Sequence, residues 1–304
     1  MNKLKRNYEF LVLVLPGALW FLLFSYIPML GIVIAFKRYK ISGGFIESVL
    51  KSKWVGFGNF KFLFKSSDAW VITRNTVGYN LIFIILGIVL PICVALMLSE
   101  LLNQKLAKFY QSSMFLPYFL SWVVVSYCLY AFLSPEDGYI NNLITQNGGE
   151  GISWYTESKY WPYIIILMSQ WKLIGYNTVI YLAAICGINK SYYEAAMIDG
   201  ATKIQQIRYV TIPLLKPVVT ILFILAIGKI FNADFGLFYQ LPMDSGPLYP
   251  VTNVINTYVY RALMNMGEIG MSSAVALYQS VVGLVLILAS NKIVSVIDNE
   301  NTLF

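Results

Sequence analysis

Three ionisable side chains lie inside long apolar stretches of this sequence, where a charge is costly and commonly serves a function. They are Lys172, Lys229 and Asp234. Histidine is absent, and the three cysteines form no CxxC pair. Histidine-based catalysis is therefore excluded, and no zinc or redox motif can be recognised. The chemistry these residues offer is the binding of a polar molecule by charge and hydrogen bonds.

The composition places these residues in a membrane protein. Of 304 residues, 58% are hydrophobic and 12% are charged, and the mean hydropathy is +0.65. A soluble domain carries about 25% charged residues. We therefore expect an all-α integral membrane protein. The net charge of +7 comes without a basic block, so nucleic acid is not an expected partner, and an excess of Lys and Arg is usual in cytoplasmic loops of membrane proteins.

Six stretches are long enough to cross a bilayer, because a transmembrane helix needs about 20 mostly apolar residues. They form one membrane domain, 1–304, and lie near 11–36, 77–98, 114–133, 161–186, 214–238 and 273–294. No small-residue cleavage site follows the first stretch, which we expect to be retained as a helix. An even number of spans puts both termini on the same side of the membrane. Charge does not identify that side, because ten Lys and Arg residues fall on each.

The loop between the fourth and fifth stretches has the pattern of two short helices joined by a turn. Its residues of interest are Glu194, Ala195, Ala196, Asp199, Gly200 and Pro213. Asp199 is expected to cap the second helix, and Gly200 to permit the sharp turn. Pro213 is expected to open the next apolar helix. The two alanines give a small face that could dock into a groove on a partner protein.

This pattern resembles the EAA motif of ABC importer permeases, in which a glycine follows EAA after three residues and I-x-L-P follows nine residues later. The departures are Val210 and Ile212, both conservative. The segment Tyr193–Pro217 is similar to maltose-type carbohydrate permeases, and the N-terminal stretch is similar to the subgroup that imports oligosaccharides. The resemblance implies the type I importer permease fold, with six transmembrane helices. It also implies that 187–213 is the cytoplasmic coupling-helix loop and that both termini are cytoplasmic.

The resemblance further implies a permease subunit in a bacterial plasma membrane that forms half of the path of a sugar, expected to be an oligosaccharide. Its implied partners are a second homologous permease, two ATPase subunits and an extracytoplasmic solute-binding lipoprotein. The sequence contains no GxxxxGK[ST] motif, which a phosphate-binding loop would require. We therefore expect ATP and magnesium to bind the ATPase subunits, and this chain to bind no cofactor or metal and to catalyse no reaction.

In maltose-type permeases the sugar lies between the helices that flank the coupling loop. Carried over, this implies that Tyr176 and the stretch 229–235, with Lys229, Asn232 and Asp234, lie near the sugar. Lys172 is a further candidate because it is a charge inside an apolar stretch, and Trp171 because its ring could lie beneath sugar C–H groups. Two lysines against one carboxylate suggest an acidic glycan, such as one containing uronic or sialic acid. The alternative is that either lysine pairs with Asp234 or with the second permease, and that Trp171 packs between helices.

Two other functions stay open at this point. A permease that imports an amino acid, a peptide or phosphate would carry the same coupling motif. A membrane-embedded transferase is less favoured, because the adjacent carboxylates Glu136 and Asp137 point to different sides of the chain and make a poor acid–base pair.

Overall fold

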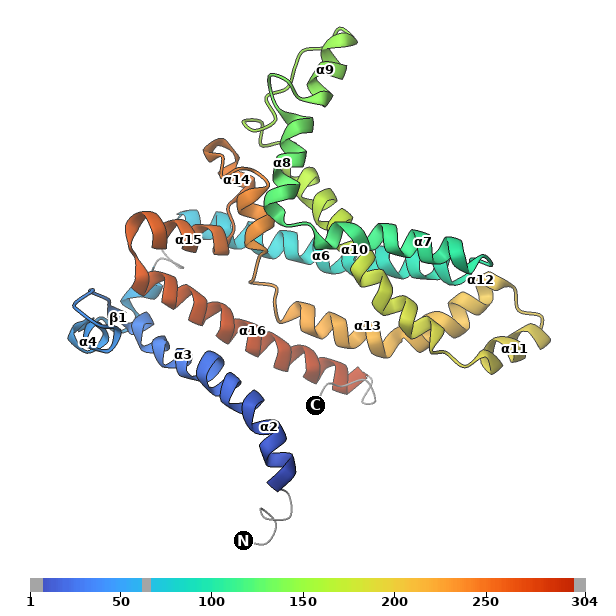
Figure 1. Cartoon of the computed structure of the whole chain (residues 1–304), viewed down its shortest axis with the longest axis horizontal. Coiled ribbons are helices and arrows are strands. Elements are labelled where there is room, and N and C mark those ends of the chain that lie inside the picture. The colour runs from blue at the N-terminus through green and yellow to red at the C-terminus, as the bar shows by residue number, and fades with distance from the viewer. Residues whose placement is uncertain (1–7, 62–66, 298–304) are drawn as a thin grey trace. The chain divides into compact units, whose positions relative to one another are not determined.

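The computed structural model describes residues 8–61 and 67–297. Helices dominate this part of the chain, and its only sheet has two strands, in agreement with the expected all-α class. The chain divides into two compact units, residues 1–69 with 259–280 and residues 70–258 with 281–304. The order of the elements can be followed in Figure 1 from the N-terminal blue to the C-terminal red. Both predicted cytoplasmic termini, 1–7 and 298–304, lie outside the described residues.

The first unit contains the N-terminal apolar helix, which is continuous over Tyr8–Phe36. Its parts are α2 (Tyr8–Phe21), the π-helix η1 (Leu22–Tyr26), α3 (Ile27–Met29) and the 3-10 helix η2 (Leu30–Phe36). After it come β1 (Lys37–Arg38), α4 (Phe45–Lys51), β2 (Lys53–Trp54) and η3 (Gly56–Phe60). The two strands pair antiparallel. The amide of Asn59 donates to the carbonyls of Ala35 and Lys37, each at 2.9 Å, and so holds η3 against the end of the long helix.

The second unit holds the remaining long helices. Its first half contains α6 (Ser67–Ser99), α7 (Gln104–Phe115), η4 (Leu116–Phe119), α8 (Trp122–Leu133), α9 (Tyr139–Gln146) and α10 (Trp161–Cys186). There follow α11 (Lys190–Ile198), α12 (Lys203–Gln206), the π-helix η5 (Ile207–Thr211), α13 (Ile212–Ile227) and the π-helix η6 (Gly236–Gln240). The last elements are η7 (Gly246–Leu248), α14 (Tyr249–Thr252), α15 (Ile255–Met266) and α16 (Ile269–Ile297). The boundaries between the two units fall inside α6, α15 and α16, so each of these helices has residues in both units.

Each of the six predicted apolar stretches contains a large helical part. Within the described residues, four unbroken helices are long and apolar enough to cross a membrane, and the count reaches six if two bent helix pairs are each one span. The fourth stretch, predicted at 161–186, has the same bounds as α10.

Two of the predicted spans differ from the structure. The third, expected at 114–133, is not one straight helix, because the chain bends by 99° between Phe119 and Trp122. The fifth, expected at 214–238, is a helix that begins at Lys203 and ends at Ile227. Residues 228–234 are not helical, so the charged residues predicted for this span lie in a break rather than on a helix face.

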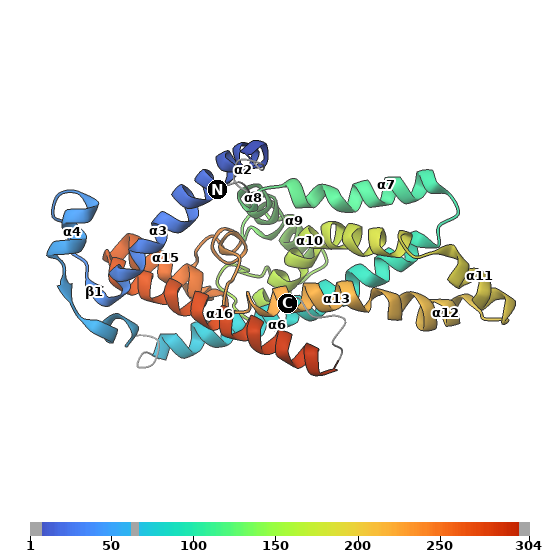
Figure 2. The same cartoon turned by 90° about the horizontal axis from the view of Figure 1, so that it is seen from below.

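Two apolar clusters hold the second unit together. One gathers buried residues of α6, α8 and α10 with the stretch 233–254, and includes the fully buried Trp161. The other joins α6, α10 and α13 around Tyr181. Figure 2 shows α10 lying between α7 and α13. Along both α6 and α10 the two clusters are separated in sequence, and a cavity lies on the stretches between them.

Candidate functional site

The cavity has a volume of about 450 Å³ and is bounded by α6, α10, α13 and the residues that follow α13. Four of the six predicted substrate residues line it, namely Tyr176, Lys229, Asn232 and Asp234. Its other polar lining residues are Asn80, Ser169, Gln170, Asn177 and Tyr181, and the rest of the wall is apolar. A concave, largely apolar wall with a few convergent polar groups is typical of a small-molecule site.

The break after α13 is held in place by side chains from two other helices. The amide of Asn80, on α6, donates to the carbonyls of Ile230 at 2.9 Å and Asn232 at 3.0 Å. The amide oxygen of Asn256, on α15, accepts the backbone N–H of Ala233 at 3.0 Å. Backbone groups outside a helix need such partners in an apolar environment. The non-helical segment is therefore a fixed part of the cavity wall.

Asp234 accepts three hydrogen bonds. The backbone N–H groups of Gly236 and Leu237 donate to its Oδ1 at 2.9 and 3.2 Å, so the carboxylate caps the start of η6. The indole Nε1 of Trp122 donates to its Oδ2 at 2.8 Å. None of the ion pairs among the described residues joins Asp234 to a lysine.

Lys229 is the cationic residue of the cavity wall. Its side chain is exposed, and it forms no hydrogen bond or ion pair with any described residue. An ammonium group has three donors and no acceptor. Its donors are thus available to a ligand in the cavity.

The other two predicted substrate residues do not line the cavity. Lys172 is 8% exposed, and its ammonium donates to the carbonyls of Pro117, Tyr118 and Leu120, at the bend of the third span. Trp171 is 43% exposed and lies outside the lining. Tyr176 is joined to the bend as well, because its ring stacks on that of Tyr118 with centroids 4.6 Å apart and planes 11° apart.

Two residues that position this site were not predicted. Asn80 is a lone amide among apolar residues of the second stretch, and such a side chain in a membrane helix is a detectable signal. Trp122 gave no comparable signal, because a tryptophan is largely apolar and its place within the third predicted stretch indicated no polar partner.

The predicted coupling loop forms two short helices joined by a turn. Asn189 caps α11 by accepting the N–H of Ser191. At the other end, Gly200 has a φ of +79°, its N–H donates to the carbonyl of Met197, and the N–H of Ala201 donates to that of Ala196. These two bonds form a Schellman motif, which favours glycine at the left-handed position. The predicted role of Gly200 in the turn agrees with the structure.

The predicted cap of the second helix was wrong. Asp199 is the last residue before the turn and ends α11. Thr202 caps α12 instead, because its hydroxyl accepts the N–H of Gln205 while the Gln205 side chain accepts the N–H of Thr202. This reciprocal capping box satisfies two helix-end donors at once. Asp199 is four residues before Lys203, the first helical residue, and is too early for the capping position.

Pro213 lies in the first turn of α13, as predicted. This helix follows η5 without a break, so that Lys203–Ile227 is one continuous helix. Proline lacks an N–H and its ring crowds the carbonyl four residues earlier. The π-helical turn η5 ends at Thr211, two residues before this proline, and η1 ends at Tyr26, two residues before Pro28. The wider π turn accommodates the proline in both helices.

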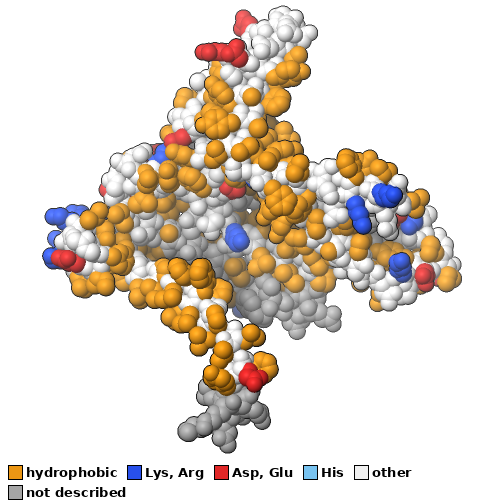
Figure 3. Space-filling view, viewed as in Figure 1, with side chains coloured by type: hydrophobic (Ala, Val, Ile, Leu, Met, Phe, Trp, Pro, Cys, Tyr) orange, Lys and Arg blue, Asp and Glu red, His pale blue; other side chains and the backbone are white. Residues whose placement is uncertain are grey.

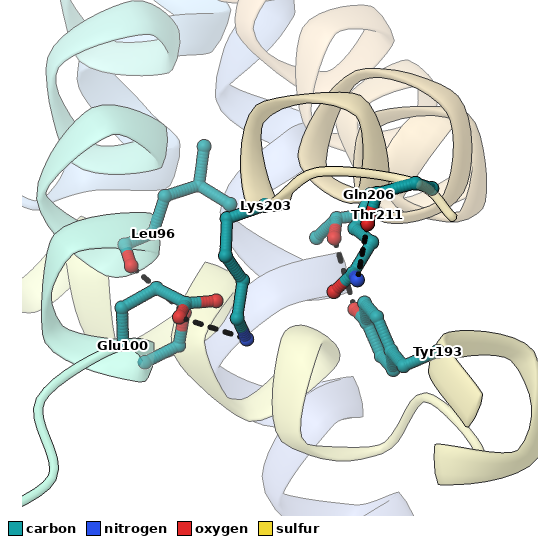
Figure 4. A network of polar contacts seen from close by, with 8 residues as sticks. Leu96, Glu100, Tyr193, Lys203, Gln206 and Thr211 are labelled. Atoms are coloured by element: carbon teal, nitrogen blue, oxygen red, sulfur yellow. Dashed lines mark hydrogen bonds and ion pairs between the residues drawn. The ribbon is translucent and has the colours of Figure 1, made fainter. Parts of the chain in front are cut away.

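Side-chain contacts join the two short helices of the coupling loop to η5 and to the end of α6 (Figure 4). The hydroxyls of Tyr193 and Thr211 lie 2.9 Å apart and join α11 to η5. Lys203 forms an ion pair with Glu100, at the end of α6, at 3.1 Å. The remainder of α11 is open, since no residue of this helix is buried and Glu194 is exposed. A helix fixed at one side and open on the other can present a face to a partner.

The fold and this arrangement are those of a transport permease, and comparisons with known proteins identify the family. The profile of the binding-protein-dependent transport system inner membrane component family matches residues 84–297. The chain is 34% identical to Protein LplB of Bacillus subtilis over 99% of its own length and 92% of that protein. The chain belongs to this family, and it is a multi-pass membrane protein.

Two further relatives are similar over nearly the whole chain. The polygalacturonan/rhamnogalacturonan transport system permease protein YteP of Bacillus subtilis is 35% identical over 95% of this chain and 88% of its own. A crystal structure of a bacterial ABC transporter involved in the import of the acidic polysaccharide alginate contains a chain with a TM-score of 0.87. That chain is 31% identical, with 98% of both chains covered.

Proposed function

We propose that this chain is the permease subunit of an importer for an acidic oligosaccharide and forms half of its path across the membrane. The observation that carries the proposal is the unpartnered ammonium of Lys229 on the cavity wall. A cation in a largely apolar wall that forms no ion pair with a described carboxylate favours an anionic ligand, because the ligand supplies the missing counter-charge. Asp234 does not compete for this cation, since its oxygens accept other donors.

The cavity wall also offers partners for the neutral groups of a sugar. Tyr176 offers an aromatic surface for sugar C–H groups, the amide of Asn232 offers donors and an acceptor for hydroxyls, and the amide oxygen of Asn80 offers an acceptor. The relatives support a uronate ligand in particular. One similar permease is named for polygalacturonan and rhamnogalacturonan, and one similar structure belongs to a transporter of the acidic polysaccharide alginate.

The proposed assembly contains a second homologous permease, two ATPase subunits that bind ATP and magnesium, and an extracytoplasmic solute-binding lipoprotein. A structure related to this chain is described in complex with an alginate pentasaccharide-bound periplasmic protein, which supports the last of these partners. In this assembly the chain binds no cofactor and catalyses no reaction. ATP-driven motion would reach it through 187–213, where α11 presents Glu194, Ala195 and Ala196, and the loop turns at Gly200.

Within the second unit, the distribution of charge supports a cytoplasmic position for that loop in a bacterial plasma membrane. Figure 3 shows basic side chains gathered over the end formed by α7, α11 and α12, and acidic side chains at the tip of α9. Lysines of the first group are Lys105, Lys108, Lys190 and Lys203. Lys and Arg are enriched in cytoplasmic loops. This orientation puts both termini in the cytoplasm.

The test uses the complete importer, with its binding protein, reconstituted in proteoliposomes. The probes are radiolabelled trigalacturonate and, as a neutral sugar of equal length, maltotriose. Lys229→Met should raise the half-saturating concentration of trigalacturonate about tenfold, since a hydrogen bond to a charged group contributes about 1.5–3 kcal/mol. Lys229→Arg keeps the charge and is the matched control. Unchanged uptake by K229M, or a wild-type protein that prefers maltotriose, would contradict the proposal.

A permease for a non-sugar solute is the second candidate, because phosphate and amino acids also carry anionic groups. The cognate binding protein separates the two. Its thermal stability should rise with oligouronates and stay constant with amino acids, peptides and phosphate. A ligand that binds only the folded state raises stability by mass action, so the rise identifies the ligand class without any transport measurement.

A further inference from the structure

The bend in the third span leaves backbone groups without helical partners. The 3-10 helix η4 ends at Phe119, and α8 begins at Trp122 after a turn of 99°. Carbonyl groups in the last turn of a helix have no partner within that helix. Inside a membrane protein such groups must find a partner elsewhere, because water is scarce and an unpaired carbonyl is costly.

Lys172, on α10, supplies that partner for two carbonyls and a second partner for that of Pro117, which also accepts the N–H of Leu120 at 3.2 Å. Its ammonium donates to the carbonyls of Tyr118 at 2.9 Å, Leu120 at 2.5 Å and Pro117 at 3.3 Å. These bonds account for all three donors of the ammonium group. A positive charge at the carboxyl end of a helix is favourable as well, because the helix dipole is negative there.

The same bend carries two rings that contact the cavity wall. The ring of Tyr118 stacks on Tyr176, and the indole of Trp122 donates to Asp234 at 2.8 Å. The ammonium of Lys172 lies 5.4 Å from the centroid of the Trp122 ring and 5.8 Å from that of Tyr118. Each ring thus contacts Lys172 on one side and a residue of the cavity wall on the other, Tyr176 for Tyr118 and Asp234 for Trp122.

We propose that Lys172 is a positioning residue for the cavity. Its ammonium holds the bend, and the bend places Trp122 against Asp234 and Tyr118 against Tyr176. In this role Lys172 does not touch the ligand, in contrast to the substrate contact predicted from its place inside an apolar stretch. That this arrangement affects substrate binding rests on the proposed function. That Lys172 positions Trp122 against Asp234 does not.

The experiment measures hydrogen exchange by mass spectrometry on the complete importer in lipid nanodiscs, without any glycan. Lys172→Met should accelerate exchange in two separate segments, 117–124 at the bend and 234–238 beside Asp234. Loss of a charge-assisted bond corresponds to roughly a tenfold faster exchange. Lys108→Met is the matched control. It removes an exposed lysine of α7 on the same bent helix pair and should leave both segments at the wild-type rate.

A second variant keeps the proposal testable if K172M fails to assemble. Trp122→Phe removes the indole donor but keeps an aromatic ring, and should accelerate exchange at 234–238 while 117–124 stays at the wild-type rate. Wild-type exchange at 234–238 in either variant would overturn the proposal. A rise in K172M that extends over α13 would overturn it too, since Lys172 would then stabilise the fold as a whole. Failure of trigalacturonate uptake by the wild type would contradict only the proposed function.

Discussion

Gly175 offers a strict test of how α7 packs on α10. A Cβ atom at this position would lie 2.0 Å from the carbonyl oxygen of Met114 and 2.6 Å from the backbone nitrogen of Phe115. Real Cβ contacts are essentially never under 3.0 Å, so Gly175→Ala must move the two helices apart by about the difference, 1 Å. The obstructing atoms belong to the backbone and cannot rotate away. Lys172 lies one turn before this contact, so the same movement pulls the bend away from its ammonium.

The cost can be worked from these contacts. Overpacking of a well-packed interior costs about 1–3 kcal/mol, and the backbone obstruction puts this case at the upper end. Alanine in a helix is better than glycine by about 0.5–1 kcal/mol. The net loss is about 2 kcal/mol, which is roughly a thirtyfold change in the folding equilibrium.

The assay is unfolding of the purified subunit by a titration with sodium dodecyl sulfate, followed by circular dichroism. Gly78→Ala is the control, because Gly78 lies in the helix α6 and a Cβ there meets no atom within 4 Å. G78A should be neutral or more stable by up to about 1 kcal/mol. If G175A unfolded at the same detergent fraction as G78A, the close approach of α7 and α10 would be refuted.

Two further substitutions test the site and the loop. A Cβ at Gly236 would lie 2.2 Å from Cδ1 of Trp122, so Gly236→Ala should displace the indole from Asp234 and lower trigalacturonate uptake about tenfold, the effect of one lost charge-assisted hydrogen bond. Subunit amount on immunoblots controls for expression, and wild-type uptake would show that this bond does not matter to transport. Glu194→Lys reverses an exposed charge on a helix with no buried residue, so it should abolish ATP-driven uptake while membrane insertion is normal. Lys190→Met, on the same helix, is its control, and normal uptake by E194K would refute the coupling role.

Local signals were enough to predict helices whose ends are marked by neighbouring residues in the sequence. For α10 both ends agree, because Pro162 suits the first turn of a helix and Gly187 follows its last residue. The turn at Gly200 was predicted for the same reason, since a left-handed residue in a helix–turn–helix favours glycine. The fold class followed from composition, which needs no boundary at all.

Features that depend on distant partners could not be predicted. Pro117 lies just before the bend of the third stretch, but the bend is stabilised by Lys172, more than fifty residues away in sequence. The choice between Asp199 and Thr202 as the cap of α12 illustrates a second difficulty. Both are good capping residues. Thr202 is the cap because Gln205 follows it by three residues and completes a capping box with it.

The structure also changes what the excess of lysines means. The sequence count of two lysines against one carboxylate suggested two cations for an acidic ligand, yet Lys172 is fully engaged by backbone carbonyls. Among the residues that line the cavity, the charged ones are Lys229 and Asp234, and Asp234 is stabilised by three donors. In the proposed importer, a single ammonium on this wall would contact the carboxylates of an oligouronate, one on every sugar, one at a time as the chain advances. Weak, repeated binding of this kind suits a transport path, where a ligand must be able to leave each site it enters.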